Sequence, residues 1–208
     1  MFSMNIKIDF EKTNLNNFLN KLDTSSVEDM SYMFYMNINS KKIDVSHFIT
    51  EKVKNFEYMF YNCILVQELN VENFNTYNAE KMNNMFDSCN SVQFLNVTNF
   101  NTIQATNMNS MFKDCPKIQI LDVTNFETAS VVAMSHTFEN DESIKELNVE
   151  NFSIGRVKDM SFMFHKCTSI KYLNLSKFNS FQLQNTKAMF SDCIKLKKID
   201  IGNYFGLY

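Results

Sequence analysis

Five cysteines are the residues whose type and spacing could most directly do chemistry in this 208-residue chain. They recur at a 26-residue interval, or at twice that interval where one copy is missing: Cys63, Cys89, Cys115, Cys167 and Cys193. Zinc would need clustered ligands, but the chain has no C-x-x-C pair and no histidine at the cysteine position of the repeat. We therefore expect reduced, buried thiols that pack as small apolar side chains, with an oxidative cross-link between neighbours as the alternative.

The histidines do not form a recognisable catalytic set. His47 falls at a predicted turn, whereas His136 and His165 fall on outward positions of predicted helices. A triad needs a nucleophile, a base and an orienting group that converge, and the acidic residues form no obvious pair for acid and base work. The sequence therefore predicts a non-enzymatic protein without cofactor or metal, whose function lies on a surface.

The cysteines are one column of a repeat. A Met-Phe pair returns at the same 26-residue interval, with Thr137-Phe138 in the single gap: Met33-Phe34, Met59-Phe60, Met85-Phe86, Met111-Phe112, Met163-Phe164 and Met189-Phe190. A fixed period in the twenties indicates units that stack into a solenoid with one shared core. We expect one domain over 1–208, with an N-terminal cap at 1–21, seven repeats at 22–198, and a last strand and C-terminal cap at 199–208.

Each repeat contains two hydrophobic periods. Leu69 and Val71 alternate with polar residues, which is typical of a short strand with one buried face. From Ala79 the apolar residues are spaced by three, three, one, three and three, which predicts a helix of about ten residues, with Thr76 or Asn78 as its N-cap. The expected fold class is therefore α/β, a solenoid with one short parallel strand and one short helix per coil.

Two further columns are expected to stabilise the stack. A phenylalanine after each strand should plug the interior and stack on its neighbour in the next coil; these are Phe48, Phe74, Phe100, Phe126, Phe152 and Phe178. An inward asparagine beside it should hydrogen-bond the backbone of adjacent coils; these are Asn73, Asn99, Asn125, Asn151 and Asn203. At the start, Ile6, Ile8 and Phe10 suggest a strand, and Leu15, Phe18, Leu19 and Leu22 a helix.

The outward strand positions are the predicted binding surface, because stacked repeats create an extended concave face that such proteins use for binding. The candidate residues are Asp44, Ser46, Asn70, Glu72, Asn96, Thr98, Asp122, Thr124, Asn148, Glu150, Asn174 and Ser176. Small polar residues that merely keep the sheet solvated are the alternative, since these columns hold no aromatic or arginine anchor. A tyrosine-rich edge, with Tyr32, Tyr35, Tyr58 and Tyr61, is the second candidate surface.

The repeat resembles that of a known family. The pattern L-x-V-x-N-F-x-T-x-x-V-x-x-M-x-x-M-F-x-x-C-x-x-I, over about Leu22 to Tyr204, is similar to the 26-residue repeat of BspA-type leucine-rich repeat proteins of bacterial surfaces and mycoplasmas. The resemblance implies a leucine-rich-repeat solenoid that binds or adheres, without catalytic residues. Members on cell surfaces generally carry a signal peptide or lipoprotein cysteine, which is not seen here, and one repeat departs from the pattern at Thr137 and Asp141.

Composition limits the partners. The formal net charge of −3 gives no basic field for nucleic acid, and no apolar run reaches the roughly 18 residues of a membrane helix. We expect a protein partner, or a glycan, and a cytoplasmic location if Met1 is the native start; a cell-surface location is the alternative if the chain is a fragment. Tyr204, Phe205, Leu207 and Tyr208 either fold over the last coil or leave it open for end-to-end self-association. A spacer with no ligand of its own is the competing function, and a thiol or metal protein the less favoured one.

Overall fold

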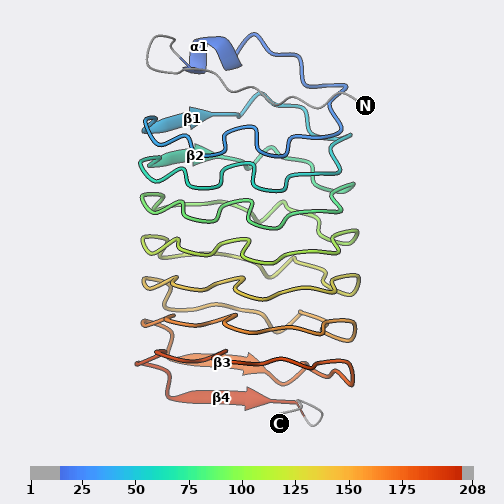
Figure 1. Ribbon diagram of the computed structural model, residues 1–208, viewed down its shortest axis with the longest axis vertical. Coiled ribbons are helices and arrows are strands. Elements are labelled where there is room, and N and C mark those ends of the chain that lie inside the picture. Colours follow the sequence, from blue (N-terminus) through green and yellow to red (C-terminus); the bar gives the residue numbers. More distant parts are fainter. Residues whose placement is uncertain (1–14, 203–208) are drawn as a thin grey trace.

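The computed structural model describes residues 15–202, and in it successive 26-residue segments run as flattened coils that lie one above another (Figure 1). The regular elements are short: α1 (Leu15–Leu19), β1 (Lys42–Asp44), β2 (Glu68–Asn70), β3 (Tyr172–Leu175) and β4 (Lys198–Ile201). Strand β1 pairs in parallel with β2, and β3 with β4. Both pairings join equivalent positions of neighbouring repeats, for example Ile43 with Leu69 and Leu173 with Ile199.

The prediction of a strand in every coil is correct for these four segments only. In the middle coils, Leu95, Val97, Leu121 and Val123 are still buried in alternation, but no strand is formed there within the described residues. The alternation of apolar and polar residues thus follows from side-chain burial and does not require a strand. The bridges between these coils lie at another position of the repeat. Single parallel bridges connect successive coils at residues 29, 55, 81, 107, 133, 159 and 185.

The predicted helix in each repeat is wrong. Residues 30–37, and their equivalents in each following repeat, form a run of tight turns that we call the turn segment; the only helix in the described part of the chain is α1. Within one turn segment, the N–H of Asp87 and that of Cys89 donate to carbonyls three residues earlier. The alternate N–H groups, those of Phe86 and Ser88, donate instead to Met111 and Lys113 in the next coil. A helix would bond these groups four residues back within the same coil.

Left-handed residues make this geometry. Each coil places two non-glycine residues at positive φ, four positions apart, such as Tyr58 and Asn62, or Asn84 and Ser88. Such a backbone costs roughly 1–2 kcal/mol per residue, least for Asn and Asp. The four bonds that a turn segment donates to the next coil contribute roughly 0.5–1.5 kcal/mol each, which offsets that cost. The apolar spacing of three, three, one, three and three suits turns as well as a helix, so the sequence pattern alone did not separate them.

Aromatic rings form the centre of the core. The phenylalanines of the Met-Phe pairs, together with Phe138 after Thr137, stack from coil to coil, with centroids 5.2–5.9 Å apart and nearly parallel planes. The second column, expected to stack on itself, is buried as predicted. However, most of its ring contacts are tilted ones with the first column, such as Phe86–Phe100 at 6.3 Å; Phe126 and Phe152 do stack on each other.

The recurring threonine position of the repeat also joins coils and does not cap a helix. The Thr76 hydroxyl donates to the Asn101 carbonyl at 2.8 Å and accepts from the Asn101 N–H at 2.8 Å. Thr24, Thr50, Thr102 and Thr128 make the same pair of bonds with the following coil. One buried hydroxyl thus satisfies a donor and an acceptor of its neighbour's backbone.

The asparagine ladder is confirmed as a set of donors, but its members are exposed and not inward. Asn73, Asn99, Asn125 and Asn151 each donate to a carbonyl of the preceding coil at 3.0–3.2 Å. At the N-terminal end, α1 confirms the predicted helix around Leu15 and Leu19. The expected strand at Ile6, Ile8 and Phe10 lies outside the described residues, as do Asn203, Tyr204, Phe205, Leu207 and Tyr208. The domain limits and the end-to-end association therefore stay predictions.

Replacing one ring of the stack tests the core. Phe112 is fully buried and lies 5.7 and 5.8 Å from the rings of Phe86 and Phe138. We expect Phe112→Ala to lower the free energy of unfolding by about 3–5 kcal/mol, because it removes ring contacts on both sides and leaves a cavity. Chemical denaturation measures this. The control is Phe94→Ala, an exposed ring, for which a change within about 0.5 kcal/mol is expected. Equal losses in the two variants would contradict the stacked core.

Candidate functional site

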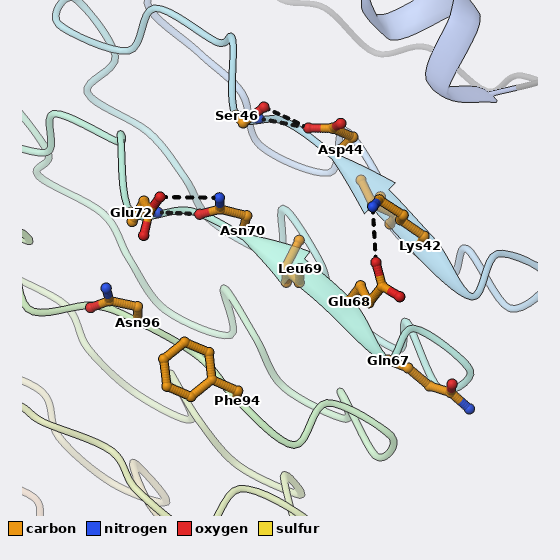
Figure 2. Close-up of a pocket in the computed structure, with 11 residues that line it drawn as sticks. Lys42, Asp44, Ser46, Gln67, Glu68, Leu69, Asn70, Glu72, Phe94 and Asn96 are labelled. Atoms are coloured by element: carbon orange, nitrogen blue, oxygen red, sulfur yellow. Dashed lines mark hydrogen bonds and ion pairs between the residues drawn. The ribbon is translucent and has the colours of Figure 1, made fainter.

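The predicted binding residues lie together on one side of the stack, which we call the strand face: residues 42–46 and their equivalents in each coil. Two open hollows mark it. The first, of about 430 Å³, is lined by five of the candidates, Asp44, Ser46, Asn70, Glu72 and Asn96 (Figure 2). The second, of about 450 Å³, is lined by three, Asn148, Glu150 and Asn174. The coil spacing therefore brings most of the candidates to the walls of two hollows.

The polar candidates are already hydrogen-bonded to one another. In each coil the Oδ1 atom of the first candidate accepts the N–H of the second, two residues later, at 3.0–3.2 Å. These are Asx turns, in which an Asp or Asn side chain closes a local backbone turn. The Ser46, Thr98 and Thr124 hydroxyls donate to the same Oδ1 atoms. Each pair thus stabilises the turn that follows the strand position of its coil.

These bonds also fix the charge of the acidic candidates. The Ser46 side chain and N–H lower the pKa of Asp44, and those of Thr124 lower the pKa of Asp122. Hydrogen bonds to a carboxylate stabilise its charged form. Asp44 and Asp122 therefore stay negative at neutral pH and contribute to an acidic surface.

The sequence analysis missed an adjacent outward column. It begins with Lys42 and Glu68, which form an exposed ion pair at 2.9 Å, and continues through Phe94, Ile120, Glu146 and Tyr172 to Lys198. Phe94 is 67% exposed and Ile120 70%, in neighbouring coils at the middle of the strand face. Phe94 lines the first hollow and Tyr172 the second. Phe94, Ile120 and Tyr172 each directly precede a buried leucine, and alternation along the strand therefore predicts that they point outward. This signal could have identified the column from the sequence.

Four of the five cysteines in the thiol column are buried as predicted. All five cysteines are free, and each donates its Sγ–H to a phenylalanine carbonyl of the preceding coil, for example Cys89 to Phe60 at 3.4 Å. Burial raises the pKa of Cys63 to about 12 and raises those of Cys89, Cys115 and Cys167 well above the usual range. Cys193 in the last coil is half-buried. The reactive thiolate is therefore disfavoured along the column, least so at Cys193.

Asp141 replaces a cysteine in the irregular repeat. It is 0% exposed, its Oδ1 accepts the Cys115 N–H at 3.1 Å, and its buried Oδ2 has no partner. Burial raises its pKa well above the usual range, and the nearby charges of Asp114 and Asp87 raise it further. The hydrogen bond from the Cys115 N–H lowers the pKa but does not offset the burial. The carboxyl is therefore stabilised in its neutral form, at the cost of an unsatisfied polar atom in the core.

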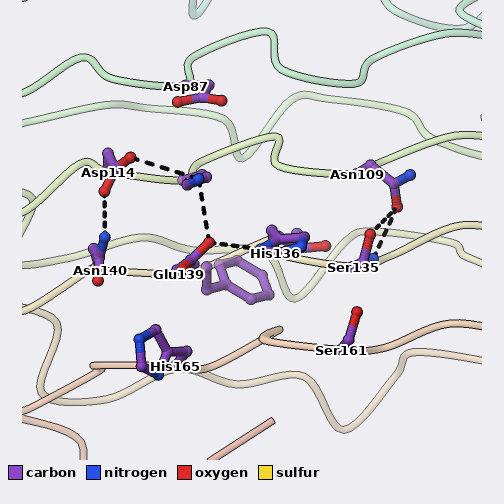
Figure 3. A network of polar contacts seen from close by, with 12 residues as sticks. Asp87, Asn109, Asp114, Ser135, His136, Glu139, Asn140, Ser161 and His165 are labelled. Atoms are coloured by element: carbon purple, nitrogen blue, oxygen red, sulfur yellow. Dashed lines mark hydrogen bonds and ion pairs between the residues drawn. The ribbon is translucent and has the colours of Figure 1, made fainter. Parts of the chain in front are cut away.

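A polar network lies over the turn segments of the middle coils (Figure 3). His136 Nδ1 is 2.6 Å from Glu139 Oε2, and Lys113 Nζ is 3.4 Å from the same oxygen. Burial opposes the charge of Lys113, but Glu139, Asp114 and Asp87 together raise its pKa. In residues 15–202 no hydroxyl or thiol is hydrogen-bonded to a histidine: His47 and His165 contact backbone carbonyls. The network therefore balances charge, and it contains no nucleophile held by a base.

Metal clusters and membrane spans are two further kinds of site. Across 15–202, no three or more His, Cys, Asp and Glu side chains are grouped so that they could hold a metal ion. In the same range, no helix has the length and hydrophobicity required to span a bilayer.

The fold and the site define a repeat protein, in which 26-residue units share one core and present a polar strand face. The chain belongs to the family described as "Mycoplasma protein of unknown function, DUF285", whose model matches residues 4–94 and 80–204. Comparisons with curated proteins and with solved structures found no match.

Burial of the thiols predicts their reactivity. With an aromatic disulfide reagent at neutral pH, Cys193 should react first in the folded protein, and the other four only as fast as the protein unfolds. Five thiols should be counted in denaturant. Cys193→Ser should abolish the early phase and serves as the control. Fast reaction of several thiols in that variant would contradict the buried column.

Asp141 should make stability depend on pH. Its pKa is higher folded than unfolded, so its contribution is full below about pH 3.9, the unfolded value, and is lost as pH rises through the folded pKa. Asp141→Cys, which restores the repeat, should raise the free energy of unfolding at pH 7 by about 1–3 kcal/mol and by less at pH 4. Chemical denaturation at both values measures this.

The control for Asp141 is Thr137→Met, the other irregular position of that repeat, which changes no titrating group. Its effect should be the same at pH 4 and pH 7. A gain for Asp141→Cys that does not change with pH would show that the carboxyl is not the cause.

Proposed function

We propose that this protein is a non-enzymatic leucine-rich-repeat solenoid that binds a protein partner through its strand face. The observation that carries the proposal is the pair Phe94 and Ile120, two large apolar side chains exposed in adjacent coils in the outward column of a polar face. Interfaces derive most of their energy from a few apolar or aromatic anchors surrounded by a polar rim. Phe94 and Ile120 supply the anchors, and the Asx-turn residues supply the rim.

The surroundings of the anchors suggest how a partner would be oriented. Glu72, Asp122 and Glu150 are acidic residues of the neighbouring candidate columns. Two exposed ion pairs lie beside them, Lys177 with Glu150 and Lys42 with Glu68. Tyr172 holds its hydroxyl at 2.7 Å from Asp200 and lines the second hollow. An apolar segment with flanking basic residues would complement this face, since opposite charges set the direction and rate of association.

A spacer role is the alternative, and one observation favours it. The side-chain oxygens of the six Asx turns accept local N–H groups, so these residues would be retained even on a surface with no ligand. That explanation covers the polar columns, but it does not account for two exposed apolar side chains in adjacent coils.

The experiment is an affinity capture from the source cells, with the natural chain and its variants as baits. We expect at least one protein to bind the natural chain and to be recovered about 30-fold less by Phe94→Ser/Ile120→Ser, which corresponds to about 2 kcal/mol at a hot spot. Charge reversal at Glu72, Asp122 and Glu150 should weaken the same contact. Binding is then repeated with the purified partner by calorimetry.

The matched control is Ile194→Ser, which removes an equally exposed apolar side chain outside the strand face. Its recovery of the partner should equal that of the natural chain, and the double variant and the control should keep the natural denaturation midpoint. If every captured protein is recovered equally by the double variant and the control, the strand face is not the binding surface and the spacer function is favoured.

A further inference from the structure

A second surface lies on the turn segments of the first two coils. Tyr32, Tyr35, Tyr58 and Tyr61 form a two-by-two array that we call the tyrosine cluster. Across the coils, Tyr32 stacks on Tyr58 and Tyr35 on Tyr61, each with centroids 5.0 Å apart. Within each coil the two rings are 5.4 Å apart. Tyr32 is 38% exposed and Tyr35 41%, so the cluster presents aromatic rings to solvent.

The groups around the cluster are mostly carboxylates. Burial raises the pKa of Tyr32, and the Glu57 charge raises it further; for Tyr61 the second cause is Asp87. Lys113 is the one cation that acts on Tyr61, and it is shared with Glu139 and Asp114. In the described part of the chain no lysine or arginine lies over any of the four rings. The electron-rich ring faces and nearby carboxylates create a site that attracts a positive charge.

Farther along the chain, lysine side chains lie over two aromatic rings. Phe162 occupies in its coil the position of Tyr32 and Tyr58, and Lys187 of the next coil lies over its ring, 5.9 Å from the centroid. Lys198 lies in a similar way over Tyr172, at 5.2 Å. Lys187 stands one position short of a full repeat after Phe162. The residue at the same offset from Tyr32 is Glu57, so at the first coil a carboxylate stands at the position of the lysine.

We propose that the tyrosine cluster binds a lysine or arginine side chain from a basic segment of a protein partner. The ammonium or guanidinium group would contact the exposed parts of Tyr32 and Tyr35, because Tyr58 and Tyr61 stack on the sides that face the next coil. Glu57 would neutralise its charge. This surface is separate from the strand face. The partner supplies the positive charge here, whereas at Phe162 the chain's own Lys187 supplies it.

The test uses the whole protein and a fluorescein-labelled peptide of four arginines alternating with glycine, at about 150 mM salt. Carbon–proton spectra of the tyrosine rings should show shifts for the four cluster residues and none for Tyr77, an exposed tyrosine outside the cluster. Fluorescence anisotropy should give a Kd about five-fold weaker for Tyr32→Leu/Tyr35→Leu. Tyr32→Phe/Tyr35→Phe keeps the rings and should bind within about two-fold of the natural chain. Tyr77→Leu should have no effect.

Glu57→Lys provides a second test that keeps all four tyrosines. It replaces the neutralising carboxylate by an ammonium, so the cluster should repel the arginines and the peptide should no longer shift its rings. Equal binding by the leucine and phenylalanine variants would overturn the proposal, as would equal shifts with a glutamine-for-arginine peptide. Ring shifts with maltohexaose but not with the arginine peptide would also overturn it, and would assign the cluster to glycans. Variants of Phe94 and Ile120 should leave peptide binding unchanged, so this test is independent of the strand face.

Discussion

The structure depends on backbone hydrogen bonds that leave one coil and end in the next. In every turn segment but the last, alternate N–H groups donate to carbonyls of the following coil, as Phe60 does to Met85 and Phe86 to Met111. These bonds hold identical positions of successive coils one above another. Stacked rings, threonine pairs and the thiol column all follow from that register, because each requires the same side chain at the same place one coil later.

The same constraint divides the residues by task. The side chains at positions that recur from coil to coil, such as Phe86 and Thr76, make contacts between coils and are buried. The Asx-turn residues are also engaged, since each closes a local reversal of the chain. Positions that vary from coil to coil are free to differ in function. Phe94 and Ile120 on the strand face, and the tyrosine cluster on the turn segments, are both local exceptions in columns that are otherwise polar or mixed.

The sequence predicts the 26-residue stacking and the buried columns because apolar residues at a constant interval must share a core. It does not distinguish turns from a helix, since Met82, Met85, Phe86 and Cys89 have a spacing that suits both. Glycine usually marks left-handed backbone, but Tyr58 and Ser88 adopt it without that signal. The polar candidates on the strand face were found because similar residues recur at their positions in each repeat. Phe94 and Ile120 were missed because the residue type at their position varies from repeat to repeat.

Hydrogen-bond scalar couplings measured by NMR on the isotopically labelled protein test the ladder between coils most directly. The structure predicts correlations from the amide nitrogens of Phe60, Phe86 and Phe112 to the carbonyl carbons of Met85, Met111 and Thr137, each in the following coil. Correlations from the same nitrogens to carbonyls four residues earlier, such as Phe86 to Met82, would show a helix in each repeat and contradict the account.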